Sequence, residues 1–226
     1  RKILTEGFDP PAYYLSVTYR DLTQRQARWA REKEEGTTRS RPAVRPWKVP
    51  AKDDSYSGLV ALINQNGQVE RTSSSDFLHG IMVTENGVLA ASHHDLTLHS
   101  ADLKFQKPFA SYPAFNALHS MRRSTKGFLL ASSGTDSIFE LSNDGREILW
   151  SWWASDHGYT DDKFGEERQL DKNADHRMNE YDTWLHTAHV NAATEYDENN
   201  IVATMFMKGT LVKLNKVTGQ TTEIIS

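Results

Sequence analysis

Three histidines recur in similar contexts within this chain of 226 residues. His79 and His119 each lie eight residues before a glycine, Gly87 and Gly127, and each glycine opens an apolar run. His189 begins a third copy of the pattern, whose apolar run covers residues 200–204. The first two histidines are 40 residues apart, which is an interval typical of one blade of a β-propeller.

This recurrence indicates a shared site. Side chains at the start of the inner strands of a propeller point toward its central channel, so we expect His79, His119 and His189 to meet there, with Asn191 beside His189. Neutral imidazoles can give and take protons near neutral pH, and they can also act as nucleophiles. We therefore predict that His79, His119, His189 and Asn191 are the catalytic residues of a channel-mouth site.

Converging imidazoles also suit a divalent transition metal such as zinc, iron or copper. The same three histidines are the candidate metal ligands, with His186 and His94 as alternates. His93 and His94 are adjacent on an expected strand and face opposite sides, so at most one of them can enter the site. The alternative is structural: a histidine at a repeated position can simply hydrogen-bond the neighbouring blade.

A charged stretch at about residues 154–183 reads as an insertion between two blades. Asp171, Asn173 and Asp175 within it have the spacing of the first, third and fifth ligands of a calcium loop. His176 stands where such loops need glycine. The alternatives for this stretch are therefore a calcium loop and a solvated lid.

The rest of the repeat predicts the fold. Four segments alternate apolar and polar residues around a tight turn, and they begin at Leu59, Leu96, Ile138 and Leu211. Together with the inner strands they predict an all-β fold, a β-propeller of four-stranded blades with about four blade units in this chain. Either residues 13–17 complete the first blade, or further blades outside this chain make a larger ring.

The domain organisation follows from the limits of the repeat. Residues 51–226 are predicted to form the propeller domain, with the insertion at about 154–183. Residues 1–50 lie outside the pattern and are expected to form a helix over residues 22–35 and then a proline-containing extended strap.

Composition narrows the partners. The net charge of −4 gives no reason to expect nucleic acid or an anionic membrane surface as partner. No apolar stretch resembles a membrane span or a signal peptide, so we expect a soluble protein. Cysteine is absent, which excludes thiolate chemistry and leaves the compartment open. The expected partners are a small-molecule substrate and a protein partner or second copy that completes the ring.

The stretch from residue 184 to 220 resembles the arylsulfotransferase-like β-propeller family. The similarity is carried by Trp184-Leu185, by His189-Val190-Asn191, by the turn at Tyr196-Asp197 and by the strand 211–214 before Thr218-Gly219. The unit 118–153 is similar to blades of the same family, and the likeness covers about residues 77–224.

The resemblance implies a substrate pocket that contains His189 and Asn191 and holds a sulfuryl group, which the family's enzymes pass through a histidine intermediate. It also places a basic residue near Phe206 or Met207, where this chain has none, and the nucleophilic histidine in a later blade. We therefore expect an enzyme-like propeller that acts on a small polar or anionic substrate, by acid/base or metal-assisted chemistry. The alternative is a non-catalytic scaffold or ligand-binding module.

Overall fold

The computed structural model describes residues 12–18, 44–46 and 57–225, together with positions 23, 26, 27 and 30. Those four single positions fall within the expected N-terminal helix and are helical, and the remainder of that helix lies outside the described residues. The expected strap contributes β2 (Val44–Pro46), and its other residues also lie outside the described part.

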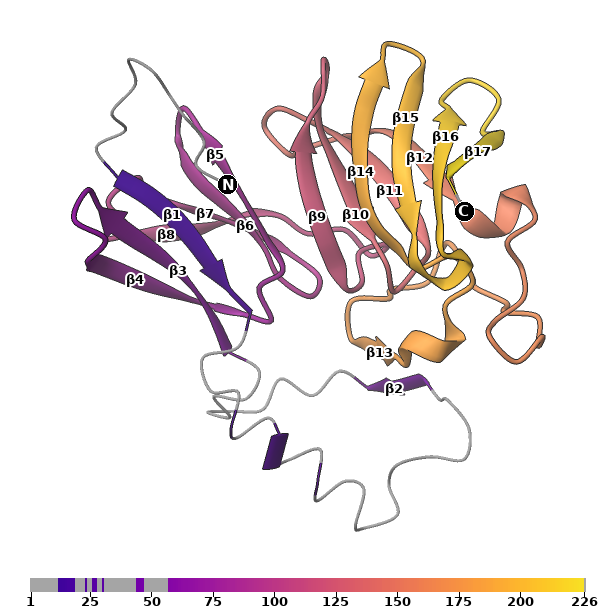
Figure 1. The fold of residues 1–226 in the computed structure, drawn as a ribbon, viewed down its shortest axis with the longest axis horizontal. Helices are drawn as coiled ribbons and strands as arrows, with labels where there is room; N and C mark the ends of the chain where they lie inside the picture. The colour runs from indigo at the N-terminus through magenta and orange to yellow at the C-terminus, as the bar shows by residue number, and fades with distance from the viewer. Residues whose placement is uncertain are drawn as a thin grey trace.

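Antiparallel sheets dominate the described residues, which confirms the predicted all-β, propeller-like fold (Figure 1). The first sheet contains β1 (Ala12–Val17), β3 (Ser57–Asn64) and β4 (Val69–Asp76). The second contains β5 (Gly80–Thr84), β6 (Gly87–Ala91), β7 (Leu96–His99) and β8 (Gln106–Ala110). The third contains β9 (Leu118–Arg123), β10 (Gly127–Ser132), β11 (Ser137–Ser142) and β12 (Ile148–Trp153). The fourth contains β14 (Val190–Asp197), β15 (Asn200–Met205), β16 (Thr210–Asn215) and β17 (Thr221–Ile225).

The apolar runs after each glycine form strands that are covered on both faces. In β10, Phe128 and Leu130 pack into the core shared with the second sheet, while Leu129 and Ala131 pack into the core shared with the fourth. Successive side chains of a strand point to opposite faces, so one continuous apolar run can fill two cores. The run therefore forms the middle of a stack of sheets.

The four-stranded sheets follow one another like blades around an axis. Their first strands are innermost, because β9 contacts both β5 and β14. The first and fourth sheets lie at opposite ends of the row of sheets in Figure 1. The inner strands therefore bring residues that are far apart in the sequence to one central region.

The first sheet differs from the others. Ser73 of β4 hydrogen-bonds His99 and Gln106 beside the β7–β8 turn of the next sheet. The outer strand of the third sheet, β12, contacts the β16–β17 turn of its next sheet in the same way, so β4 corresponds to an outer strand. Gly58 at the start of β3 lies against Leu78, just before β5. β1, β3 and β4 therefore take the second, third and outer places. Residues 13–17 add a strand to this blade, but no described residue takes the inner place beside β1.

The repeated glycines have a steric cause. A Cβ atom on Gly127 would lie 1.9 Å from the carbonyl oxygen of Leu141, and one on Gly87 would lie 2.0 Å from that of His99. In both sheets the third strand approaches the start of the second strand too closely for any side chain. The glycine of the repeat therefore marks a close contact between two backbones.

Gly127→Ala is expected to lower the free energy of unfolding by about 1–3 kcal/mol, because the added methyl group must push the backbone of β11 away. Urea denaturation would measure this change. Lys126→Ala, at an exposed neighbouring position, is the control and should leave stability almost unchanged. Equal stabilities of the two variants would contradict the steric explanation.

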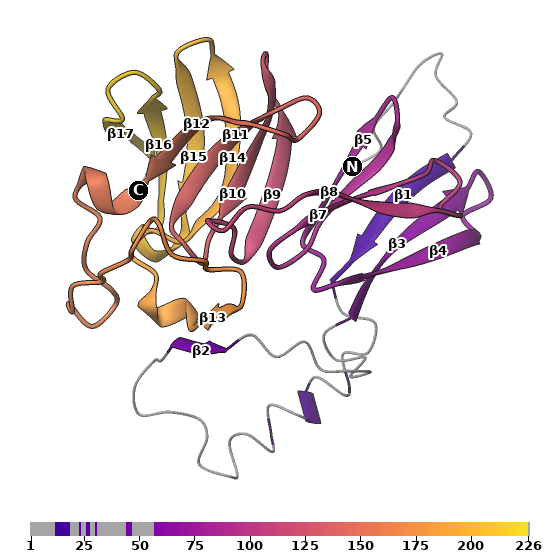
Figure 2. The ribbon, with the colours of Figure 1, turned by 180° about the vertical axis from the view of Figure 1, so that it is seen from behind.

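The insertion lies between the third and fourth sheets in the sequence. It contains η1 (Ala154–His157) and β13 (Asn179–Tyr181), and η2 (Thr183–Leu185) follows it. β13 pairs with β2, and this pair lies below the third and fourth sheets as drawn in Figure 2. Within the described part of the chain, helices are all too short or too polar to cross a bilayer.

Candidate functional site

The entries to the three inner strands share an unusual backbone conformation. Positive φ angles mark Phe77 (45°), Ala117 (47°) and His189 (50°). Two residues after these positions the chain carries His79, His119 and Asn191. The structural repeat therefore places Asn191 in line with the first two histidines.

Strand pairing gives the same result. β9 skips His119 in its pairing with β10, and β14 skips Asn191 in its pairing with β15. The predicted equivalence of His189 with His79 and His119 is therefore wrong by two residues, since His189 takes the place of Ala117. A second bulge near Glu195 adds one residue to β14, and this extra residue hid the correct alignment.

Although its register differs, His189 still joins the other predicted histidines. The rings of His79 and His119 stack with centroids 4.5 Å apart, and His119 meets His189 edge to face at 5.2 Å. His186, predicted as an alternate, stacks on His189 at 4.7 Å. Four imidazoles from three sheets thus form one continuous row, and Asn191 is the next residue but one after His189.

His186 and His189 are joined by a hydrogen bond between ring nitrogens. The Nδ1 atoms of the two rings are 2.6 Å apart. Because a neutral imidazole carries one proton, one Nδ1 must donate and the other must accept. A proton gained on the outer nitrogen of one ring can therefore be passed to the other ring through this contact.

The row is held in the neutral state by burial. Desolvation, with a smaller contribution from His189, lowers the pKa of His119 to about 4. Desolvation also lowers the pKa of His186 well below its usual value, assisted by the positive charge of Arg168. The pKa of His189 is lowered by the same burial, although Asp136 and Asn191 oppose the shift. At neutral pH these three rings are therefore proton acceptors.

The imidazoles of the row include the predicted ligands of a divalent metal. Zinc ligands place their nitrogen atoms about 2.0–2.2 Å from one point. Within the described ranges, no group of three or more His, Cys, Asp or Glu side chains is arranged to hold a metal ion. The hydrogen bond between the ring nitrogens of His186 and His189 suits proton transfer between the two rings.

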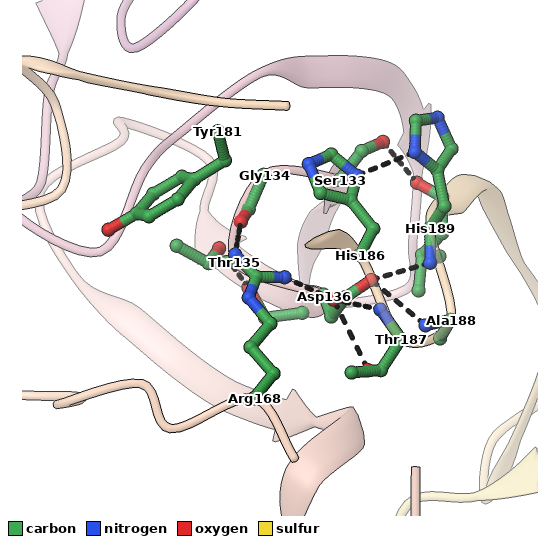
Figure 3. A network of polar contacts seen from close by, with 12 residues as sticks. Ser133, Gly134, Thr135, Asp136, Arg168, Tyr181, His186, Thr187, Ala188 and His189 are labelled. Carbon is green, nitrogen blue, oxygen red and sulfur yellow. Dashed lines mark hydrogen bonds and ion pairs between the residues drawn. The ribbon is translucent and has the colours of Figure 1, made fainter. Parts of the chain in front are cut away.

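A buried carboxylate organises the segment that carries His186 and His189. Asp136, in the loop between β10 and β11, accepts hydrogen bonds from the backbone amides of Thr187 (2.8 Å), Ala188 (3.2 Å) and His189 (2.5 Å). The hydroxyl of Thr187 donates a further bond (Figure 3). One side chain of the third sheet thus fixes the entry to the fourth.

Asp136 is neutralised by a residue of the insertion. Arg168 donates to the Asp136 carboxylate at 2.5 Å and to the carbonyl of Gly134 at 2.5 Å (Figure 3). The side chains of Arg168 and Asp136 are only 9% and 5% exposed. The ion pair is therefore buried directly behind the histidine pair.

A cavity of about 390 Å³ reaches His186 from the outside. Its walls include Trp184 and Phe206, of which the latter lies in η3 (Phe206–Lys208), and the cations Lys163 and Lys208. The ammonium group of Lys163 lies 3.6 Å from the centre of the Trp184 ring. The carboxylates of Asp161 and Asp162 also line it, so the cavity offers aromatic surface and charges of both signs beside a neutral imidazole. Lys208 is adjacent to the pair 206–207 at which the resemblance requires a basic residue.

The other predicted ligands lie elsewhere. His93 Nε2 contacts the carbonyl of Asn179, and burial lowers the pKa of His93 to about 4. His94 lines a different cavity of about 530 Å³ between the first two sheets. His94 is therefore not part of the row of four imidazoles.

The residues of the predicted calcium loop interact with protein groups. The Asp171 carboxylate accepts from the backbone amide of Asn173, and Asp175 pairs with the guanidinium of Arg177 at 2.7 Å. His176, at the expected glycine position, is buried and contacts Tyr181 and the Asp171 carbonyl. The loop is thus held by its own side chains in this structure.

Comparisons with known proteins give only distant similarities. No family model matches the chain, and no curated protein matches it. Solved structures with a similar shape include a CNH domain (10% identity, 82% of this chain and 50% of that chain, TM-score 0.48). Virginiamycin B lyase from Staphylococcus aureus (9% identity, 79% and 58%, TM-score 0.47) and a protein of unknown function from Bacteroides caccae (10%, 74% and 54%, TM-score 0.45) are others. The chain spans about half the length of these three.

Sequence reasoning missed Asp136, Arg168 and the cavity lysines. Asp136 lies in the Gly-Thr-Asp turn between β10 and β11, and its position between two buried strands is the signal that could have identified it. Arg168 is one of many charged residues in the insertion and has no distinguishing pattern. Its partner is 32 residues away, so only the folded chain identifies the pair.

Proposed function

We propose that this chain is an enzyme-like propeller in which the His186–His189 pair acts as a general base and proton relay for a small anionic substrate. The observation that carries the proposal is the 2.6 Å contact between the two Nδ1 atoms, next to a cavity lined by His186. Burial lowers the pKa of both rings, so both are neutral at pH 7 and each has one ring nitrogen that can accept a proton.

The tautomers define the direction of the relay. If His186 Nδ1 donates to His189 Nδ1, the Nε2 atom of His186 is an acceptor, and a substrate hydroxyl group that reaches this buried atom from the cavity can give it a proton. Nε2 is buried and makes no normal hydrogen bond within the described residues, although the nearby Tyr181 backbone favours protonation to a small degree. The proton then moves through the Nδ1 contact to His189, where Asp136 stabilises the charge.

The cavity suggests the kind of substrate. Lys163 and Lys208 can bind an anionic group, although Asp161 and Asp162 line the same cavity. Trp184 and Phe206, which are 43% and 56% exposed, can cover a planar body. The resemblance to arylsulfotransferases suggests an aryl sulfate as the first probe of this cavity. The transfer of a sulfuryl group to a phenol would break the S–O bond to the leaving aryl oxide and form a new one to the acceptor oxygen. The relay would take the proton of the acceptor phenol and return it to the leaving aryl oxide.

The binding step can be tested by titrating 4-nitrophenyl sulfate into the protein in a calorimeter. Lys208→Met is expected to weaken binding roughly tenfold, because a hydrogen bond to a charged group contributes about 1.5–3 kcal/mol. Lys126→Met, which removes an exposed lysine of the β9–β10 turn, is the matched control. His186→Gln should leave binding nearly intact and abolish any release of 4-nitrophenol in the presence of phenol. Equal affinities of the Lys208→Met variant and the unmodified protein for 4-nitrophenyl sulfate would contradict the assignment of this cavity as the substrate site.

A further inference from the structure

We infer that Arg168 is a positioning residue, and that residues 160–168 of the insertion form a latch that holds the His186–His189 pair in place through Asp136. The inference rests on the proposed function, because it concerns the same two histidines. It adds a link between the wall of the substrate cavity and the alignment of the proton relay.

The first step concerns the backbone amides that precede β14 and need hydrogen-bond acceptors. The amides of residues 187–189 precede β14 and have no strand partner, and a single carboxylate accepts all three. The carbonyl groups of Ala188 and His189 accept hydrogen bonds from η3, since Met207 and Phe206 donate their amides to them. The donors of the segment therefore depend on Asp136 alone.

The second step is the charge. A buried carboxylate is stable only when a counter-charge and hydrogen bonds replace its water. Arg168 supplies both with one planar group, since its two terminal nitrogens reach Asp136 and the carbonyl of Gly134 at the same time. The guanidinium also lies 4.9 Å from the centre of the Tyr181 ring, which covers it from the side.

The third step is the origin of Arg168. Residues 160–168 form a small hairpin, in which the Arg168 amide donates to Thr160 at 2.8 Å and the Asp162 amide donates to Glu166 at 3.0 Å. The same hairpin carries Asp161 and Lys163, which line the cavity beside His186. A displacement of this hairpin would therefore open the cavity wall and withdraw the charge behind the histidine pair together.

The test compares Arg168→Met with Arg168→Lys by nuclear magnetic resonance on protein labelled with ¹⁵N in its histidines and backbone. In Arg168→Met the hydrogen-bonded imidazole signal of the His186–His189 pair should disappear. Exchange of the amide protons of residues 187–189 should be about tenfold faster or more, because bonds to a charged acceptor are lost. Arg168→Lys should recover part of both signals, since lysine keeps the charge but lacks the planar fork with which arginine reaches Asp136 and Gly134 together. Lys172→Met, which removes the exposed pair of the insertion with Asp156, should match the unmodified protein.

The outcomes separate this inference from the proposed function. Unchanged exchange and an unchanged imidazole signal in Arg168→Met would overturn the latch, whatever the protein binds. Altered signals in Arg168→Met, together with no binding of 4-nitrophenyl sulfate by the unmodified protein, would support the latch and contradict the proposed substrate. If Arg168→Met does not fold, Arg168→Lys decides: signals like those of the unmodified protein would overturn the need for the planar group, and partial loss would support it.

Discussion

Asp136→Ala is expected to lower the free energy of unfolding by about 3–5 kcal/mol, the range measured when one partner of a buried ion pair is removed. The change leaves Arg168 as an unpaired charge and takes the acceptor from the amides of residues 187–189. Because these groups are buried, water cannot replace the lost bonds without opening the interface between the third and fourth sheets. Chemical denaturation followed by tryptophan fluorescence measures the loss.

Asp156→Ala is the matched control for that measurement. Asp156 also pairs with a cation of the insertion, Lys172, but both side chains are well exposed, 46% and 38%. Exposed pairs contribute about 0–1 kcal/mol, so this variant should stay close to the unmodified protein. A loss for Asp136→Ala no larger than that for Asp156→Ala would show that the buried pair is dispensable.

Acid is expected to unfold the protein between about pH 6.5 and pH 4, and buried histidines are the cause. His93 and His119 have folded pKa values of about 4, against about 6.5 in an unfolded chain. Between these two pKa values the unfolded chain binds protons that the folded chain does not bind, so the free energy of unfolding decreases as the pH falls. Above pH 6.5 the two histidines cause no such loss. Each of the two residues should remove about 3 kcal/mol by pH 4.

The histidine origin of this acid sensitivity can be checked by substitution. Unfolding free energies measured from pH 7.5 to pH 4.5 should fall by up to about 1.4 kcal/mol per pH unit for each histidine involved. The double variant His93→Gln and His119→Gln should have a shallower slope over the same range, even if it is less stable at pH 7.5. A slope identical to that of the unmodified protein would assign the acid response to other groups.

The sequence by itself determined the strands and their grouping. Runs such as 127–132 place apolar residues on both faces of a strand, so such a strand must be covered on both sides. The 40-residue interval from His79 to His119 groups these strands into repeated sheets. Residues 79, 119 and 189 were expected near one axis for the same reason, since strand entries of successive sheets lie close together. These features depend on local periodicity, which a sequence displays directly.

The tertiary structure alone decided which side chains work together at the site. A bulge adds a residue to a strand without changing its composition, so the spacing of residues could not reveal that Asn191, rather than His189, occupies the position of His119. The partnership of Asp136 with Arg168 joins a loop of one sheet to an irregular insertion. No period connects such residues, because buried charges find their partners through the packing of the whole chain.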